Sequence, residues 1–292
     1  MRPGIRLPGA EALSAAAAQL VIRSQPCNVI AIVGPHESGK TSLIGGIYDL
    51  LQYSMIGRYA FAGTSTPHAF ERACHDSRSA SKRGVPHMER TERGDATYFH
   101  LDLVRVDRDG KRAALFANRD GEAYIETHTN PDLAKGFVEL RRCDTLTVLA
   151  DGFKLLDDSE RHQVASDVRL TLRAFEESGQ TRTWQQLAIV LTKIDAVRKD
   201  KDNGERAIRD FNRIVEDVRE EFARHFMDIR PFQVAASPKD GSAERGEGMA
   251  DLLAYWMNEP GRYRHSQVSH SPQPSARAFG RLRPVALGGR NA

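Results

Sequence analysis

The feature that most constrains this chain is the stretch 34–41, which reads Gly-Pro-His-Glu-Ser-Gly-Lys-Thr. It matches the pattern G-x-x-x-x-G-K-S/T of the phosphate-binding P-loop. An apolar β-branched run at 29–33 precedes the stretch and is typical of a buried strand. Apolar residues follow it at 43, 44, 47, 50 and 51, which is helical spacing. A strand, this loop and a helix in that order predict a phosphate site at one edge of a sheet.

The residue types of this loop suit phosphate chemistry. Gly34 and Gly39 permit sharp turns and a close approach of the backbone to phosphate oxygens. The loop amides and the helix N-terminus then form a cradle for an anion. Lys40 is expected to place a positive charge on the β- and γ-phosphates, and the Thr41 hydroxyl to bind Mg²⁺. The predicted contacts of the loop with a nucleotide are Gly34, Pro35, His36, Glu37, Ser38, Gly39, Lys40, Thr41 and Ser42.

Composition limits the classes of protein to which the chain can belong. Its 292 residues, 40% hydrophobic and 28% charged, fit a globular protein with a sizeable core. The net charge of +3 is too small to indicate a nucleic-acid partner. The three widely spaced cysteines suggest neither a disulfide framework nor a metal cluster and suit a reducing compartment. No run approaches the roughly 18 apolar residues of a membrane span, so a cytoplasmic location is expected.

Strand-like and helix-like segments alternate, which predicts an α/β fold of three layers with a mainly parallel sheet between helices. We expect an N-terminal extension at 1–26 with a short helix at 11–23, a nucleotide-binding domain at 27–259, and a basic, disordered tail at 260–292. One antiparallel pair is expected, 97–106 with 112–117, around an Asp-Gly turn. The stretch 57–96 reads as a long polar connection with one helix near 67–78. The remaining expected strands are 146–150, 187–191 and 229–234, and the remaining helices are 131–142, 159–176, 206–226 and 248–258.

A second motif bears on which nucleotide is bound. Thr192, Lys193, Ile194 and Asp195 directly follow the predicted strand 187–191, at the sheet edge where α/β proteins bind ligands. This run resembles the N/T-K-x-D base-recognition motif of TRAFAC-type GTPases, the superfamily of Ras-like proteins and translation factors. The resemblance implies that Asp195 accepts hydrogen bonds from guanine N1–H and the 2-amino group, for which adenine has no matching donors. It also implies that the stem of Lys193 packs over the base, while Thr192 stands where Asn is the commonest residue.

Ala235, Ala236 and Ser237 follow the last predicted strand and resemble the short S-A-K loop of the same superfamily. In that loop the amide of the middle residue contacts guanine O6. Here the first Ser is replaced by Ala235 and the Lys is absent. The resemblance therefore implies base contacts by Ala235 and Ala236 through the backbone.

The superfamily also carries a D-x-x-G turn, which senses the γ-phosphate and Mg²⁺, and the matching run here is 118–121. The resemblance implies that the Gly121 amide touches the γ-phosphate. Asn118 replaces the metal-binding Asp and brings no charge, so weaker Mg²⁺ binding is expected. Asp151, at the end of the next strand, is a second candidate for the metal and equally a candidate helix cap. Asp120 is a third candidate for the metal.

The residues that would assist hydrolysis match the pattern of the superfamily less closely than the P-loop does. Glu122 stands where relatives carry the residue that orients the attacking water. It can act as a base, pair with Arg119, or indicate slow hydrolysis. Thr91 is the expected second Mg²⁺ hydroxyl, and its alternatives are Thr64 and Thr66. Arg90 is a candidate arginine finger supplied in cis, and its alternative is an exposed loop arginine.

The run G-K-T-S-L-I of the P-loop, with 61–66 and 70–72, further resembles the bacterial double-GTPase families of multi-component conflict and antiviral defence systems. That resemblance implies GTP and GDP as ligands, Mg²⁺ as cofactor, and a protein partner such as a second GTPase. It implies slow GTP hydrolysis serving as a switch, signalled through ordering of 57–96 and 118–130. Two alternatives remain at this stage: a GTP-binding scaffold without significant hydrolysis, and a P-loop ATPase or small-molecule kinase. A further hypothesis is that the basic tail binds nucleic acid, and the competing interpretation is a solvated tail without a partner.

Overall fold

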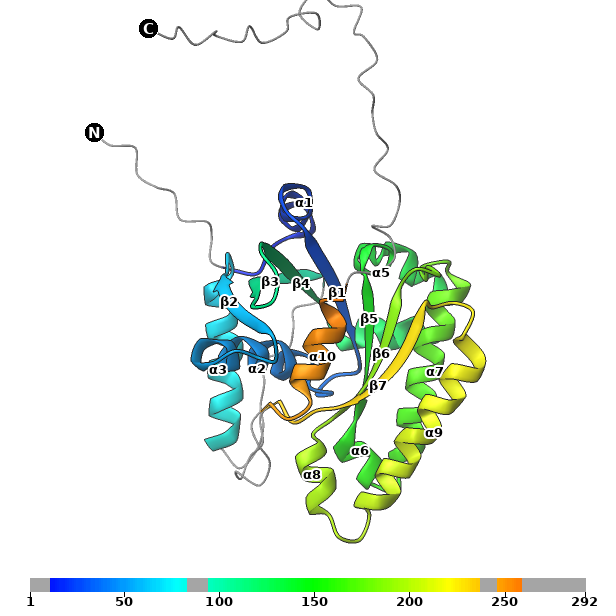
Figure 1. Cartoon of the computed structure of the whole chain (residues 1–292). Helices are drawn as coiled ribbons and strands as arrows, with labels where there is room; N and C mark the ends of the chain where they lie inside the picture. Colours follow the sequence, from blue (N-terminus) through cyan, green and yellow to red (C-terminus); the bar gives the residue numbers. More distant parts are fainter. Residues whose placement is uncertain (1–10, 83–93, 237–245, 259–292) are drawn as a thin grey trace, which may run out of the picture. The chain divides into compact units, whose positions relative to one another are not determined.

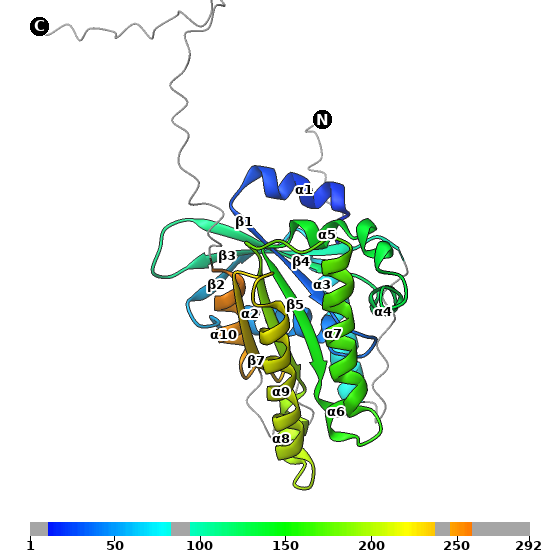
Figure 2. The same cartoon turned by 90° about the vertical axis from the view of Figure 1, so that its right-hand side faces the viewer.

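The computed structural model describes residues 11–82, 94–236 and 246–258, in which helices and strands alternate as the sequence predicts (Figures 1 and 2). The strands are β1 Cys27–Val33, β2 Tyr59–Gly63, β3 Thr97–Arg105, β4 Lys111–Asn118, β5 Thr145–Asp151, β6 Gln186–Thr192 and β7 Asp228–Gln233. The helices are α1 Ala15–Ser24, α2 Lys40–Tyr53, α3 Pro67–Lys82, α4 Gly121–Glu126, the 3₁₀ helix η1 Pro131–Gly136, α5 Val138–Arg142, α6 Gly152–Leu156, α7 Arg161–Glu177, α8 Ile194–Lys199, α9 Gly204–Phe222 and α10 Met249–Trp256.

The described strands form one sheet in the order β2-β3-β4-β1-β5-β6-β7. The five strands from β4 to β7 in this order are parallel, and β3 runs antiparallel to β4. The predicted mainly parallel sheet and the predicted antiparallel pair are both confirmed.

A second antiparallel pairing, of β2 with β3, was not predicted. Its five residues lie in the stretch expected to be a polar connection. The strand Tyr59–Gly63 contains two Ala and one Gly, which have low strand propensity, and it is too short to display a clear alternation. Its order comes from the hydrogen bonds that it supplies to the otherwise open edge of β3.

Two layers of helices cover the sheet, which confirms the three-layer architecture. Helices α2, α3 and α10 pack on one face, and α1 and α4 to α9 pack on the other (Figure 1). Successive side chains of β1 alternate between the two cores, with Val29 and Ala31 in one and Ile30 and Ile32 in the other. Every residue of β1 is buried, as expected of a central parallel strand.

The longer helices that the sequence predicts are confirmed, whereas several short helices in the structure were not predicted. The expected helix 131–142 is divided into η1 and α5 at Phe137, whose ψ of 83° is not helical. The helices α4, α6 and α8 have five or six residues, too few for a periodic pattern. Asp120 and Asp151 cap α4 and α6 by accepting the amides of Glu122 at 3.3 Å and Phe153 at 2.9 Å.

Residues 11–26 of the predicted N-terminal extension pack against this domain. Leu13 and Tyr98 of β3 exchange two backbone hydrogen bonds, of 2.8 and 2.9 Å. Helix α1 forms where a helix was expected, and the Gln25 side chain donates to Asp102 of β3 at 2.9 Å. Residues 1–10 and the predicted tail at 260–292 lie outside the described residues.

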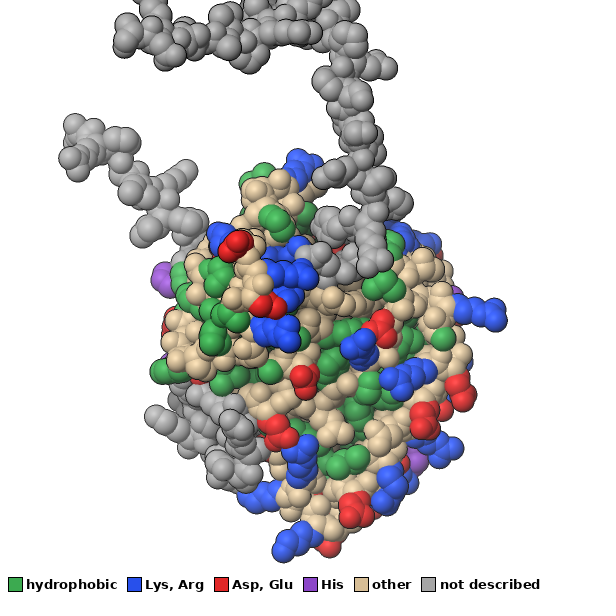
Figure 3. All heavy atoms as spheres, in the orientation of Figure 1, with side chains coloured by type: hydrophobic (Ala, Val, Ile, Leu, Met, Phe, Trp, Pro, Cys, Tyr) green, Lys and Arg blue, Asp and Glu red, His purple; other side chains and the backbone are tan. Residues whose placement is uncertain are grey.

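Charges of both signs are interspersed along the α8 and α9 side of the face shown in Figure 3. Helices α7 and α9 are joined by ion pairs, such as Arg161 with Asp210 at 3.0 Å and Arg169 with Glu221 at 3.2 Å. This mixture agrees with the small net charge of the chain. Among the described helices, none combines the length and apolar character that crossing a bilayer requires.

Candidate nucleotide-binding site

The predicted site residues gather because β4, β1, β5 and β6 are parallel neighbours. The carboxyl ends of parallel strands lie at one edge of a sheet, where α/β proteins bind ligands. The loop after β1 is the P-loop, and the turn after β4 is 119–121. Asp151 ends β5, and Thr192 ends β6 beside it in register.

The P-loop has the shape that its sequence predicts. Gly39 is left-handed, with φ of 97°, and Glu37 is also left-handed, with φ of 64°. The Ser38 hydroxyl donates to the carbonyl of Pro35 at 2.9 Å and closes the loop. Gly39 takes the N-cap position of α2, so within the described chain no side chain caps this helix. The first turn of α2 therefore presents its amides to an anion.

Lys40 is buried inside this loop. Its Nζ donates to the carbonyls of Gly34 at 2.6 Å and Pro35 at 2.9 Å. Burial lowers the pKa of Lys40 to about 8, and the negative charge of Asp120 opposes that shift. Two backbone carbonyls therefore hold the ammonium inside the loop, in a position where a phosphate would stabilise its charge.

The turn 118–121 rests directly on the P-loop. A Cβ atom at Gly121 would lie 2.6 Å from the carbonyl carbon of Pro35 and 2.7 Å from the amide nitrogen of His36. Only glycine fits such an approach without a shift of the backbone. The structure thus brings Gly121 against the phosphate loop.

Arg119 in this turn pairs with Glu139 and not with Glu122. Its guanidinium donates to both carboxylate oxygens of buried Glu139, at 2.6 and 3.1 Å. Its Nη1 donates to the carbonyl of Gly94 at 2.6 Å, and the group lies 4.2 Å from the ring centroid of Phe137. The alternative in which Glu122 pairs with Arg119 is therefore not the arrangement found.

The three candidate metal residues have different surroundings. Asn118 ends β4 and lies beside Ile32 of β1 in the sheet register. Asp120 is buried, caps α4, and acts electrostatically on Lys40. Asp151 caps α6 with one oxygen and accepts the Nζ of Lys193 at 2.8 Å with the other. The helix-cap interpretation of Asp151 is confirmed, and its second partner, Lys193, belongs to the T-K-x-D run.

The T-K-x-D run is hydrogen-bonded to the P-loop. The hydroxyl of Thr192 donates to the carbonyl of Ser38 at 2.9 Å. Lys193 has a left-handed backbone, with φ of 57°, and Asp195 lies in the first turn of α8, partly exposed. The amide of Ile194 donates to the carbonyl of Val234 at 3.2 Å, which ties the motif to the loop after β7.

That loop lies against α2. Ala235 exchanges backbone hydrogen bonds with Gly246 and Glu247, at 3.0 and 3.1 Å. A Cβ atom at Gly46 would lie 3.1 Å from the carbonyl oxygen of Ala236. The structure thus brings Ala235 and Ala236 to the same sheet edge as the T-K-x-D run, while Ser237 lies outside the described residues.

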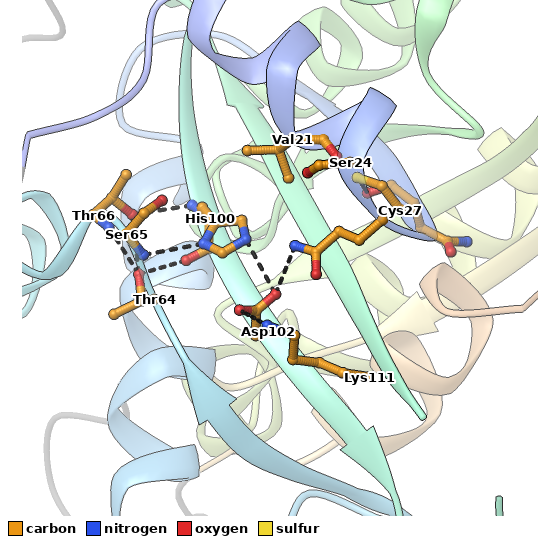
Figure 4. A network of polar contacts seen from close by, with 11 residues as sticks. Val21, Ser24, Cys27, Thr64, Ser65, Thr66, His100, Asp102 and Lys111 are labelled. Atoms are coloured by element: carbon orange, nitrogen blue, oxygen red, sulfur yellow. Dashed lines mark hydrogen bonds and ion pairs between the residues drawn. The ribbon is translucent and has the colours of Figure 1, made fainter. Parts of the chain in front are cut away.

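Two predicted site residues, Arg90 and Thr91, also lie outside the described residues. Their alternatives Thr64 and Thr66 use their hydroxyls on β3 (Figure 4). Thr64 donates to the carbonyl of His100 at 2.6 Å, and Thr66 accepts the His100 amide at 3.0 Å. These contacts attach the end of β2 to β3.

One residue that sequence reasoning missed is Phe153. Its ring is 44% exposed and its centroid lies 4.9 Å from the Nζ of Lys193. It belongs to the five-residue helix α6, so no periodic pattern marked it. The one sequence signal for Phe153 was its place two residues after Asp151, which follows a predicted strand.

The chain is similar to several solved structures at low sequence identity. They include the signal recognition particle receptor SRb–GTP/SRX complex from Chaetomium thermophilum, at 15% identity and a TM-score of 0.42, covering 80% of this chain and 96% of that one. The Ski7 GTPase-like domain of S. cerevisiae bound to GTP has 12% identity and a TM-score of 0.42, with coverage of 84% and 53%. Roco2 RocCORdC of Methanosarcina barkeri bound to GDP has 14% identity and a TM-score of 0.36, with coverage of 78% and 48%.

The chain thus spans about half the length of the last two of these structures. No curated protein matches it. The sequence model of one family matches residues 28–257, which include the P-loop, Gly121, the T-K-x-D run and the loop after β7. Since that match covers most of the chain, this protein belongs to the Double-GTPase 2 family.

Proposed function

We propose that this protein binds GTP and GDP with Mg²⁺ at the sheet edge described above and hydrolyses GTP slowly as a nucleotide-dependent switch. The observation that carries the proposal is the hydrogen bond from Thr192 to the carbonyl of Ser38. It fixes the base-recognition motif to the phosphate loop, so one nucleotide can occupy both. Membership of the Double-GTPase 2 family supports the same assignment.

The residues present fit a nucleotide. The uncapped start of α2, the buried ammonium of Lys40 and the contact of Gly121 with the loop suit a polyphosphate. On the base side, Asp195 would accept from guanine N1–H and the 2-amino group, and the Lys193 stem would cover the ring. Ala235 and Ala236 would line the base edge with backbone groups.

Mg²⁺ would be held mainly by the Thr41 hydroxyl, by Thr91 and by the turn after β4. Within the described residues no group of three or more His, Cys, Asp and Glu side chains forms a metal site, so the phosphates themselves would complete the coordination. In the turn, Asn118 and Asp120 are the candidates, and Asp120 supplies the charge that Asn118 lacks. When bound, the ion neutralises charge that develops on the β- and γ-phosphates.

The residues proposed to lie beside the γ-phosphate support slow turnover. Glu122 would orient the attacking water, but a carboxylate there is repelled by the phosphate. Arg90 would supply positive charge in cis. We further propose a cytoplasmic location and a protein partner such as a second GTPase, on the strength of the family resemblance. A bacterial multi-component system, with antiviral defence as its suggested role, is the proposed setting.

Competition binding tests the nucleotide assignment. A fluorescent GDP is bound to the full chain and displaced with GDP, GTP or ATP. GDP and GTP should displace it at least about 100-fold better than ATP, because a site built to hydrogen-bond guanine leaves buried polar groups unpaired with adenine. Equal displacement by ATP would favour the ATPase or kinase alternative.

The variant Asp195→Asn should lose about 100-fold in GDP affinity, because two charge-assisted hydrogen bonds are weakened. The same variant should gain affinity for xanthosine diphosphate, because an amide can donate to the 2-oxo group. Asp200→Asn, on the next loop, is the matched control. A single-turnover assay with GTP then separates a switch from a scaffold, since a scaffold releases no phosphate above the buffer background.

A further inference from the structure

We propose that Asp151 is a positioning residue for guanine recognition: it holds the Lys193 ammonium so that the Lys193 stem lies across the base, with Phe153 extending that platform. The inference rests on the proposed function. It gives Asp151 a role in base recognition in place of the metal role considered above.

Both carboxylate oxygens of Asp151 are committed. Oδ1 accepts the amide of Phe153 at 2.9 Å, and Oδ2 accepts the Nζ of Lys193 at 2.8 Å. Asp151 is only 3% exposed, so its carboxylate is fixed in one orientation. A carboxylate used in this way faces the base-recognition motif and has no oxygen directed to a second cation.

Two contacts hold the side chain of Lys193. Its ammonium lies against Asp151 and 4.9 Å from the ring centroid of Phe153, which adds a cation–π contact. Its backbone adopts a left-handed conformation, which non-glycine residues rarely adopt without a compensating contact. Long lysine side chains are otherwise mobile, so this arrangement removes rotamer entropy before a base arrives.

The ends of strands β5 and β6 place Asp151 next to the T-K-x-D run. Asp151 and Thr192 are register partners in β5 and β6. A Cβ atom at Gly152 would lie 2.4 Å from the carbonyl oxygen of Thr192, so the two turns touch. The start of α6 and the T-K-x-D run therefore pack directly against each other beside the P-loop.

The test is the variant Asp151→Asn in the full chain, because Asn still caps α6 but lacks the charge that binds Lys193. Binding of a fluorescent GDP should weaken about tenfold, and by the same factor in EDTA and in Mg²⁺. Tripolyphosphate, which lacks a base, should compete with unchanged affinity. Loss confined to Mg²⁺, or an equal loss of tripolyphosphate affinity, would overturn the positioning role.

A double-mutant cycle with Lys193→Met isolates the pair, because methionine keeps an apolar stem without the charge. If Asp151 acts through Lys193, the double variant should bind GDP no more weakly than Lys193→Met alone. Additive losses would contradict the inference. Asp157→Asn, an exposed acid that caps the chain just after α6, is the matched control and should bind like the wild type. Failure of the wild type to bind GDP would instead reject the proposed function.

Discussion

Lys40 is the residue whose charge state the fold alters most directly at the candidate site. Burial lowers its pKa to about 8, whereas phosphates in the loop would raise it again. Binding must therefore be accompanied by proton uptake once the pH exceeds about 8. We expect GDP affinity to be constant below pH 8 and to fall by up to about tenfold per pH unit above it.

Titration of the GDP dissociation constant between pH 7 and 9.5 measures this effect. Lys40→Arg is the control, because a guanidinium stays charged through that range. Its binding should be weaker overall but flat with pH. A flat profile in the wild type would show that the lysine is already fully charged without a nucleotide.

Single residues also differ in whether their contacts can be predicted from the sequence. The P-loop and the T-K-x-D run were predictable because their function depends on spacing within a few neighbouring positions. The pair of Asp151 with Lys193 joins residues 42 apart, and that of Arg119 with Glu139 joins residues 20 apart. Such pairs depend on strand register and helix placement, which no local pattern specifies.

At the scale of elements, the buried ion pair of Arg119 with Glu139 anchors the turn after β4 to α5. Removing one partner leaves the other charge buried and unpaired. We expect Glu139→Gln to lower the free energy of unfolding by about 3–5 kcal/mol, measured by urea denaturation. Replacing both residues with Met and Leu should cost much less. A loss below about 1 kcal/mol in the single variant would show that the pair is solvated.

His100 links β2 to β3 and gives this edge of the sheet a pH dependence. Its Nδ1 accepts the amide of Ser65 at 3.1 Å, and its Nε2 lies 3.3 Å from Asp102, which also binds Lys111 and Gln25 (Figure 4). Burial lowers the pKa of His100 in spite of the Asp102 charge. The unfolded chain therefore takes up this proton first, and folding stability falls as the pH drops below about 6.5.

Urea denaturation at pH 7.5, 6.5 and 5.5 measures this dependence. His100→Asn keeps an acceptor for the Ser65 amide but cannot titrate in this range. The wild type should lose up to about 1.4 kcal/mol more per pH unit than the variant. His128, whose pKa is also lowered by burial, is present in both proteins and cancels from the comparison. Parallel pH curves would exclude His100 as the source.

Elements differ in how much of them the sequence predicts. Long helices such as α9 were predictable because apolar residues recur along one face over several turns. Buried strands such as β6 were predictable because they are continuous apolar runs. The strand β2 was not, because it depends on the open edge of β3. The helices α4, α6 and α8 were not, because five or six residues are too few for a periodic pattern. Those short helices flank the candidate site, so its local geometry was the least predictable part.

For the whole molecule, the two cores decide which segments are free to respond to a bound nucleotide, if the proposed function holds. The sequence suggested ordering throughout 118–130. Tyr124 is fully buried between Phe137 and Phe175, and His128 contacts Thr171 of α7 at 2.8 Å. The second half of that segment is therefore part of the core that lies under α7. The first half rests on the P-loop through Gly121.

We therefore expect a response to the γ-phosphate at 118–123 and at 94–98, because Arg119 binds the carbonyl of Gly94. Hydrogen exchange with GDP and with a non-hydrolysable GTP analogue measures it. Amides at 118–123 and 94–98 should exchange at least about tenfold more slowly with the analogue, while amides at 124–130 should be unchanged. The double variant Arg119→Met with Glu139→Leu, which leaves no buried charge unpaired, should abolish the change at 94–98 and retain that at 118–123. Equal protection across 118–130 would show that Tyr124 leaves the core when the nucleotide changes.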